Sequence, residues 1–257
     1  MRVYAVRYAH RDGRRAEHFY GSDPHDGPMP MDYFLWAIVD DSGRAVVVDA
    51  GFTEETARRR GRTIVADPIA MLGELGIAAA DIEDVVLTHL HYDHSGHLGA
   101  FPRARFWIQD AELAFWTGRY AARGEYARIV EPPDVVELVR LNFERRVRFV
   151  DGDEPLRPGI SLHRVGGHAP GLQVVRVDTG AGPVVLASDA THFYENLTDD
   201  RPFAVVHELA GMYAAFDRLR GLAGGDDARI VPGHDPRVLE RYPAVSGALD
   251  GLAVAIH

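Results

Sequence analysis

Short apolar runs separated by polar turns recur along most of the chain, and runs of this kind predict β-strands. We expect strands at residues 3–8, 33–39, 45–48, 85–88, 105–109, 160–165, 173–177, 184–187 and 228–231. Two pairs of these strands are joined by short polar segments, residues 40–43 and 178–182. Each of these pairs is therefore predicted to form a β-hairpin.

Two segments have the spacing of helices. The first begins after Asp67, has Pro68 in its first turn and ends at Gly76, which is typical of a short capped helix. The second covers about residues 205–222. A predicted strand follows soon after each of them.

Residues 110–146 form the longest stretch without strand signals, and the stretch is rich in aromatic residues. Its apolar spacing predicts two helical segments separated at Pro132-Pro133. We interpret it as a helical, cap-like insertion that covers a functional site and supplies an apolar wall for a substrate. An ordinary packing insertion is the alternative.

The composition is that of an ordinary globular protein, with 46% hydrophobic and 26% charged residues among 257. The net charge is −10, and all 28 basic residues are arginines. Nucleic-acid backbones are usually bound by basic surfaces, so this charge argues against a nucleic-acid partner. The chain has no cysteine, which excludes disulfides and thiolate metal sites. We treat residues 1–257 as a single domain.

The first residues lack the apolar core of a signal peptide. No apolar run approaches the roughly 18 residues that a membrane span requires. We therefore expect no membrane partner and a cytoplasmic location.

Four metal-binding side chains fall within six residues, in the segment His89-Leu90-His91-Tyr92-Asp93-His94. The segment follows a predicted buried strand, and the glycine-containing run after it cannot continue that strand. Imidazole and carboxylate together suit zinc, and less selectively iron, cobalt or manganese. If the turn leads into a helix, neighbouring side chains point to different sides. His89 and His91 can then serve one metal, and Asp93 and His94 a second.

Three further histidines or aspartates stand directly after predicted strands. His168 follows Gly166-Gly167, Asp189 follows the strand at 184–187, and His234 follows Pro232-Gly233. Strand ends of one sheet system often converge on one site, and loops on a rigid scaffold commonly carry function. Together with the first turn, these residues supply seven ligands, enough for two divalent metals.

Asp49 also follows a predicted strand, and two interpretations of it remain open. It either contacts a group of the metal site or forms the turn.

Five segments, in this order along the chain, resemble the metallo-β-lactamase-fold hydrolases: residues 46–51, 89–94, 166–171, 188–190 and 232–235. The resemblance covers nearly the whole chain. It implies the α/β class, with an αβ/βα sandwich of two mixed β-sheets flanked by helices. It also implies a division of the ligands between two metals. His89, His91 and His168 belong to one, Asp93, His94 and His234 to the other, and Asp189 bridges them.

Within that superfamily the chain is most similar to the N-acyl-homoserine lactonases, the quorum-quenching lactonases. The activity of those enzymes implies that this protein opens a lactone or a related ester. The attacking group would be a hydroxide that bridges two divalent metals, with Zn²⁺ as the first candidate. Those enzymes carry a tyrosine three residues after the bridging aspartate, where it contacts the substrate carbonyl. Here that position is His192, and Tyr194 is the nearest tyrosine. Either side chain is a candidate for the contact, and Asp93 is a candidate to carry the proton to the leaving group.

Other functions are compatible with the same ligands. A glyoxalase-II-like thioesterase, a β-lactamase and a phosphodiesterase are hydrolytic alternatives, and a di-iron redox protein is an alternative from another class. The expected partner is a small-molecule substrate with an apolar acyl or ring portion. The aromatic stretch at 29–36 is compatible with a homodimer interface and equally with packing inside one chain.

Overall fold

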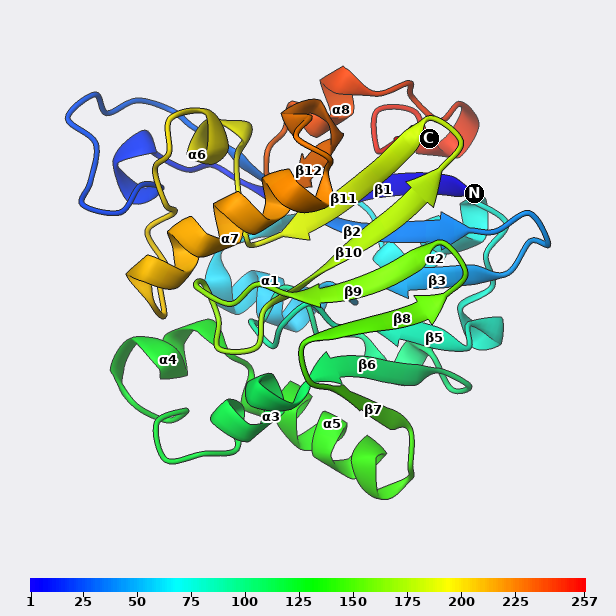
Figure 1. Ribbon diagram of the computed structural model, residues 1–257. Helices are drawn as coiled ribbons and strands as arrows, with labels where there is room; N and C mark the ends of the chain where they lie inside the picture. The colour runs from blue at the N-terminus through cyan, green and yellow to red at the C-terminus, as the bar shows by residue number, and fades with distance from the viewer.

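A computed structural model describes residues 1–257. Two mixed β-sheets lie face to face, and helices cover their outer faces (Figure 1). The predicted αβ/βα sandwich is therefore confirmed. Both chain termini lie at the same side of the molecule, where the last strand pairs with the first.

The first sheet has eight strands in the order β13-β1-β2-β3-β5-β6-β7, with β4 paired to β1. Its strands are β1 (Arg2–Arg11), β2 (Met31–Val39), β3 (Ala45–Val48), β4 (Thr63–Ile64), β5 (Asp84–Val86), β6 (Arg105–Gln109), β7 (Val147–Val150) and β13 (Ala253–Ala255). Strands β1 to β3 are antiparallel neighbours, whereas β3, β5, β6 and β7 run parallel.

The second sheet has five strands in the order β12-β11-β10-β9-β8. They are β8 (Asp153–Arg157), β9 (Ile160–Arg164), β10 (Gln173–Thr179), β11 (Gly182–Ser188) and β12 (Ile230–Pro232). Only β11 and β12 are parallel. The two predicted hairpins, β2–β3 and β10–β11, are both present.

Eight helices complete the fold, together with five 3₁₀ turns. The helices are α1 (Glu54–Arg60), α2 (Pro68–Glu74), α3 (Asp110–Trp116), α4 (Gly124–Ile129), α5 (Pro132–Phe143), α6 (Tyr194–Thr198), α7 (Leu209–Leu222) and α8 (Val238–Arg241). The 3₁₀ turns are Arg15–Glu17, Ala79–Asp81, Leu98–Ala100, Asp227–Arg229 and Gly247–Leu249. Helices α1, α2, α3 and α5 pack against the first sheet, and α6 and α7 against the second.

Strand β2 shows why the chain folds into layers. Every one of its residues is buried, and alternate side chains enter different cores. Tyr33 and Leu35 pack toward the helices, while Phe34 and Trp36 pack between the sheets. This is the two-residue period of a strand with both faces covered. The aromatic stretch at 29–36 is thus explained by packing inside one chain. It gives no support to a homodimer, which stays a prediction.

Three helical predictions need correction. Residues 110–146 contain three helices rather than two, and Pro132 begins α5 instead of only interrupting a helix. Proline suits this first position because its missing N–H has no partner there in any helix. Helix α7 begins at Leu209, later than predicted. The ligand run leads into irregular turns and the 3₁₀ turn Leu98–Ala100 rather than into an α-helix.

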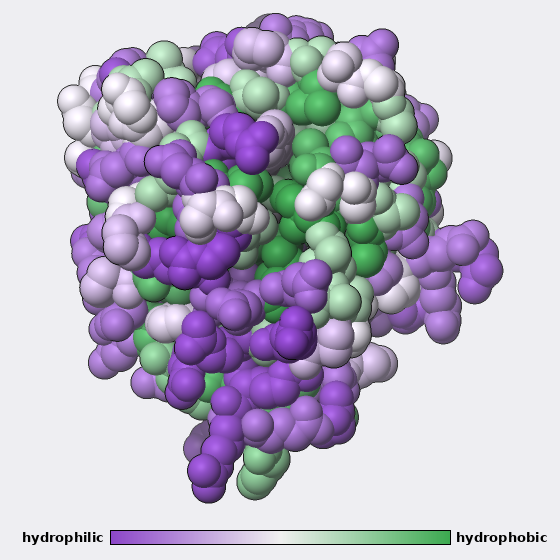
Figure 2. Space-filling model, turned by 90° about the vertical axis from the view of Figure 1, so that its right-hand side faces the viewer, coloured by the Kyte–Doolittle hydropathy of each residue, from purple (hydrophilic) through white to green (hydrophobic).

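The surface on the side of the two termini is mostly hydrophilic, with a patch of hydrophobic residues (Figure 2). None of the helices has the length and apolar character that crossing a membrane demands.

Candidate metal centre

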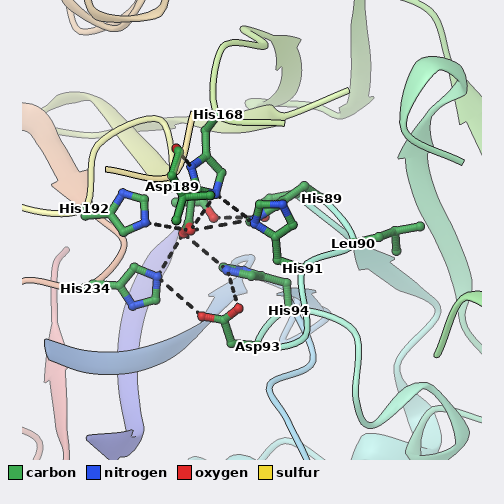
Figure 3. A network of polar contacts seen from close by, with 12 residues as sticks. His89, Leu90, His91, Asp93, His94, His168, Asp189, His192 and His234 are labelled. Carbon is green, nitrogen blue, oxygen red and sulfur yellow. Dashed lines mark hydrogen bonds and ion pairs between the residues drawn. The ribbon is translucent and has the colours of Figure 1, made fainter. Parts of the chain in front are cut away.

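All seven predicted ligands lie together where strands of both sheets end (Figure 3). They form two buried groups: His89, His91 and His168 with Asp189, and Asp93 and His94 with His234. The first turn follows β5, Asp189 follows β11, and His234 follows β12. Because β11 and β12 are parallel neighbours, their carboxyl ends meet at one edge and bring Asp189 beside His234.

Glycine before His234 is required by close packing at that edge. A Cβ on Gly233 would lie 2.7 Å from the carbonyl oxygen of Ser188. Only glycine allows the backbone to pass there, so the Pro-Gly-His sequence has a steric reason.

Asp189 lies between the two groups, and its oxygens face different sides. Oδ1 is 3.0 Å from His234 Nε2 and 3.3 Å from His94 Nε2. Oδ2 is 3.2 Å from His168 Nε2 and 3.7 Å from His89 Nε2. A carboxylate placed in this way has one oxygen for each of two cations.

Asp49 holds His94 from behind. Its Oδ2 accepts a hydrogen bond from His94 Nδ1 at 2.7 Å, and its Oδ1 accepts one from the Thr88 backbone N–H at 2.8 Å. Asp49 also has a left-handed backbone, with φ of 63°, in the turn after β3. Both interpretations left open by the sequence therefore apply to the same residue. With its Nδ1 hydrogen donated to Asp49, His94 directs Nε2 into the cluster.

Two other imidazoles are oriented by backbone carbonyl groups. His168 Nδ1 donates to Val205 O and His234 Nδ1 donates to Asp32 O, both at 2.8 Å. These contacts could not be predicted from the sequence, because any residue type carries a carbonyl oxygen.

Because these hydrogen bonds use the Nδ1 hydrogens, the Nε2 lone pairs of the imidazoles face other acceptor atoms. These contacts show whether metals fit the cluster. The Nε2 atoms of His234 and His94 face an oxygen of Asp189 that is itself only an acceptor. The Nε2 atoms of His89 and His94 are buried without any hydrogen-bond partner. A cation between these atoms removes the repulsion. The donors are nitrogen and oxygen only, a set that divalent zinc, iron, cobalt or manganese accepts. The residues therefore fit two divalent metals.

The protonation of the histidines is consistent with this fit. Burial and the neighbouring histidines hold the pKa of His89 well below its ordinary value, so its imidazole is neutral and able to bind a metal. Burial also lowers the pKa of His94, but the surrounding carboxylates, Asp189 first, outweigh burial and raise that pKa well above its ordinary value. A positive charge at this end of the cluster is thus favoured.

The two candidates for the substrate contact lie in different places. His192 lines the cavity beside the cluster, with Nε2 3.0 Å from Asp189 Oδ2 and its ring stacked on Phe203 at 3.5 Å. Burial lowers the pKa of His192 to about 3, so the ring is neutral.

Tyr194 does not line the cavity, contrary to the prediction. It is the first residue of α6, and its side chain packs in the core between the sheets, under the guanidinium of Arg241 at 3.6 Å. The start of the helix turns it away from the neighbouring His192.

The cluster opens into a cavity of about 310 Å³. Outside the cluster its wall has six hydrophobic residues, four arginines and two glutamates: Met31, Tyr33, Tyr92, Ile129, Phe203, Val205, Arg11, Arg60, Arg62, Arg128, Glu17 and Glu125. From the segment 110–146 only Glu125, Arg128 and Ile129 of α4 reach the cavity. The expectation that this segment forms an apolar wall is therefore wrong, because two of its three lining residues are charged.

The sequence profile of the Metallo-beta-lactamase superfamily matches residues 33–234. An N-acyl homoserine lactonase of Bacillus cereus is 31% identical over 65% of the chain, and the match spans 61% of that relative. The N-acyl homoserine lactonase AttM of Azorhizobium caulinodans is 30% identical over 71% of the chain and 69% of its own length. The matched part includes the strands and turns that carry the ligands.

Solved structures share the fold. An N-acyl homoserine lactone hydrolase with N-hexanoyl-L-homoserine bound at its catalytic metal centre has a TM-score of 0.77 and 19% identity, over 94% of this chain and 96% of that one. The dizinc quorum-quenching lactonase AidC has a TM-score of 0.70 and 18% identity, over 99% of this chain and 93% of that one. At this level of identity the likeness concerns the fold alone.

Proposed function

The chain belongs to the metallo-beta-lactamase superfamily, and from that membership we propose that it is a dinuclear-metal hydrolase that opens a lactone or a related ester. The relatives named N-acyl homoserine lactonases support the choice of reaction. The observation that carries the proposal is the convergence of seven buried side chains beside one cavity, in two groups linked by Asp189, which lies 3.0 Å from His234.

The proposed ligand division follows the two groups. His89, His91 and His168 would hold one cation and Asp93, His94 and His234 the other, and the position of Asp189 between the two groups would allow it to serve both. Two zinc ions held there would lower the pKa of water toward about 7 and polarise a carbonyl oxygen, so no serine or cysteine nucleophile is needed.

The side chains of the cavity have distinct proposed roles. In the net reaction water adds to the carbonyl carbon and the ester C–O bond breaks. The proton lost by water passes through the Asp93 carboxylate to the leaving alkoxide oxygen. Asp93 is suitable because it lines the cavity, with its oxygens 3.7 Å from His94 Nε2 and from His234 Nε2. His192 is the proposed substrate contact, because it lies in the cavity wall where Tyr194 does not.

The apolar part of the substrate is proposed to lie against Met31, Phe203 and Val205, the hydrophobic residues on the side of His192. The cavity of about 310 Å³ favours a compact substrate.

The test is a substrate panel on protein loaded with zinc. Lactones, thioesters, β-lactams and phosphodiesters are compared by kcat/KM, and elemental analysis gives the zinc content. We expect two zinc ions per chain, a colourless protein and the highest kcat/KM for a lactone. Preference for another class, or no turnover by protein that holds two zinc ions, contradicts the proposal. Colour with bound iron and redox activity indicates the di-iron alternative.

Phosphodiester hydrolysis is the alternative that a specific observation favours. The net charge of −10 disfavours a polyanion, but the cavity wall itself has four arginines against two glutamates. The phosphodiester arm of the same panel separates the two reactions.

A further inference from the structure

One arginine of the cavity wall has no acidic partner. Three of the four lining arginines are paired with glutamates at 2.7 to 3.2 Å: Arg11 with Glu17, Arg60 with Glu131, and Arg128 with Glu125. Arg62 instead donates from Nε to the hydroxyl of Tyr92 at 3.0 Å and from Nη1 to the carbonyl of Arg60 at 2.7 Å. A guanidinium has five N–H donors, so Nη2 and one hydrogen of Nη1 are still available.

The two tyrosines beside Arg62 leave one more donor unused. The hydroxyls of Tyr33 and Tyr92 are 3.1 Å apart, and both side chains are buried, with 2% and 8% exposure. The Tyr92 oxygen already accepts from Arg62. Whichever tyrosine donates to the other, one of the two hydroxyl hydrogens has no acceptor in the protein. Both residues line the cavity, so this buried donor faces it.

The group formed by Arg62, Tyr92 and Tyr33 therefore presents surplus donors and a positive charge, and Arg62 forms no ion pair with a carboxylate. Such a surface suits an anionic, oxygen-rich group, which accepts several hydrogen bonds at once. We propose that these three residues form a subsite for a carboxylate of the substrate, so that the preferred substrate is a lactone or ester that also carries a carboxylate. The reaction in this inference rests on the proposed function, whereas the binding of the anion does not depend on it.

The position of the subsite fixes which end of the substrate it holds. The Tyr33 ring lies 5.2 Å from the ring of His234, and Tyr92 directly precedes Asp93. The subsite thus borders the Asp93, His94 and His234 half of the cluster. Phe203 stacks on His192, whose ring lies 4.9 Å from that of His234. A substrate held at the cluster can therefore place its anionic group at Arg62 and its apolar part at Phe203.

The charge of the cavity also favours an anion. The whole chain carries −10, yet this wall has more arginines than glutamates. Asp93 and Asp189 balance the two extra arginines, and cations held at the cluster would turn this balance positive and concentrate small anions at the site.

A purely structural role for Arg62 makes a different prediction. Arg60 already covers the Tyr92 ring, with its guanidinium carbon 4.0 Å from the ring centroid. If Arg62 only supports Tyr92, its loss affects charged and neutral substrates equally. If Arg62 binds the anion, its loss affects the charged substrate much more than the neutral one.

The test uses matched substrates and matched variants. Homoserine lactones N-acylated with succinyl, glutaryl or adipoyl groups carry a terminal carboxylate, and their primary amides are neutral counterparts of the same length. Each pair is measured with wild type, Arg62→Met, Arg62→Lys and the control Arg59→Met. Arg59 lies in α1 outside the cavity wall and receives the same substitution.

We expect wild type to prefer the best carboxylate over its amide by about tenfold to a hundredfold in kcat/KM, mainly through KM. Arg62→Met lowers kcat/KM for the carboxylate much more than for the amide and so removes that preference, Arg62→Lys restores part of it, and Arg59→Met behaves as wild type. Equal kcat/KM for carboxylate and amide in wild type overturns the inference. So does an equal loss for both substrates in Arg62→Met.

Calorimetric titration of the zinc-loaded proteins with glutarate supplies a readout that does not need turnover. We expect binding to wild type and to Arg59→Met, and binding at least about tenfold weaker to Arg62→Met. If wild type hydrolyses no lactone, the proposed function fails, and this titration alone decides the inference. Equal affinities of wild type and Arg62→Met overturn it.

The tyrosine variants sharpen the result. Tyr33→Phe leaves Tyr92 with its bond from Arg62 and with a free hydroxyl hydrogen. Tyr92→Phe removes the acceptor that holds Arg62. The carboxylate preference is therefore expected to fall more in Tyr92→Phe than in Tyr33→Phe, and the reverse order contradicts the arrangement.

Discussion

The inner and outer parts of the cavity are built in different ways. In the inner cluster each metal-binding imidazole stands at a strand end or turn, and several are fixed from behind by Asp49 or by a backbone carbonyl. In the outer wall, arginines and tyrosines hold one another, and Arg62 and the Tyr33–Tyr92 pair keep unused donors. The inner part therefore has its geometry fixed before substrate arrives, whereas the outer part keeps free groups for the substrate. The proposed function places the reaction at the cluster, and the proposed subsite places the choice of substrate at the wall.

The largest effect is expected from the residue shared by both metal groups. Asp189→Ala removes the oxygens that face His234 and His168, so we expect loss of most bound metal and a loss of kcat/KM on the order of a thousandfold or more. Elemental analysis and lactone turnover measure the two effects. Retention of two metals with full turnover would show that the cluster is not organised around Asp189.

Asp49→Asn tests the hydrogen bond that orients His94, and it leaves the backbone turn intact. Asparagine tolerates a positive φ, so the turn is preserved, but the carboxylate that receives His94 Nδ1 is lost. We expect metal affinity or kcat/KM to fall by about tenfold to a hundredfold. Metal titration against a competing chelator measures the affinity. An unchanged affinity would mean that His94 needs no support from Asp49.

Asp134 tests whether packing next to the cluster affects stability without affecting the reaction. Burial, and secondarily Glu131, raise the pKa of Asp134 to about 7. In the unfolded chain an aspartate loses its proton near about 4. Between these values the folded chain binds more protons than the unfolded chain, so stability falls as pH rises.

Asp134→Asn removes this loss. We expect the Tm of wild type to fall relative to the variant by a few degrees between about pH 4 and 7, with kcat/KM unchanged. Thermal unfolding over a pH series measures the difference. Parallel Tm profiles of the two proteins contradict the assignment.

The smallest effect is expected from Tyr194→Phe. The hydroxyl is buried away from the cavity without a hydrogen-bond partner, so kcat/KM should change by less than about twofold. A loss of tenfold or more would place Tyr194 in the reaction, and the contrast between His192 and Tyr194 would no longer hold.

The metal cluster was largely predictable because its signals are local. An apolar run that ends in a turn residue and a histidine or aspartate is visible in the sequence at 89, 168, 189 and 234. The hairpins and the helix capped by Asp67 are local in the same sense, and the structure contains them. The period of a strand and the chemistry of a helix cap involve only neighbouring residues.

The outer wall was not predictable, because its contacts join distant segments. Tyr33, Arg62 and Tyr92 come from β2, the turn after α1 and the ligand run, and nothing in their local sequences marks them as neighbours. The position of Tyr194 could not be predicted for a related reason. Its distance from Asp189 along the chain was informative, but the start of α6 decided which way the side chain faces.

Most strands, the ligand types and their order were predictable from the sequence, because each depends on adjacent residues and on the chemistry of imidazole and carboxylate. Strands β4, β7, β8 and β13 were not predicted. Only the tertiary structure decided that Asp49 supports His94, that His192 rather than Tyr194 lines the cavity, and that Arg62 has no acidic partner. The physical reason is that the orientation of a side chain, and the charges around it, are set by how layers distant in sequence pack against each other.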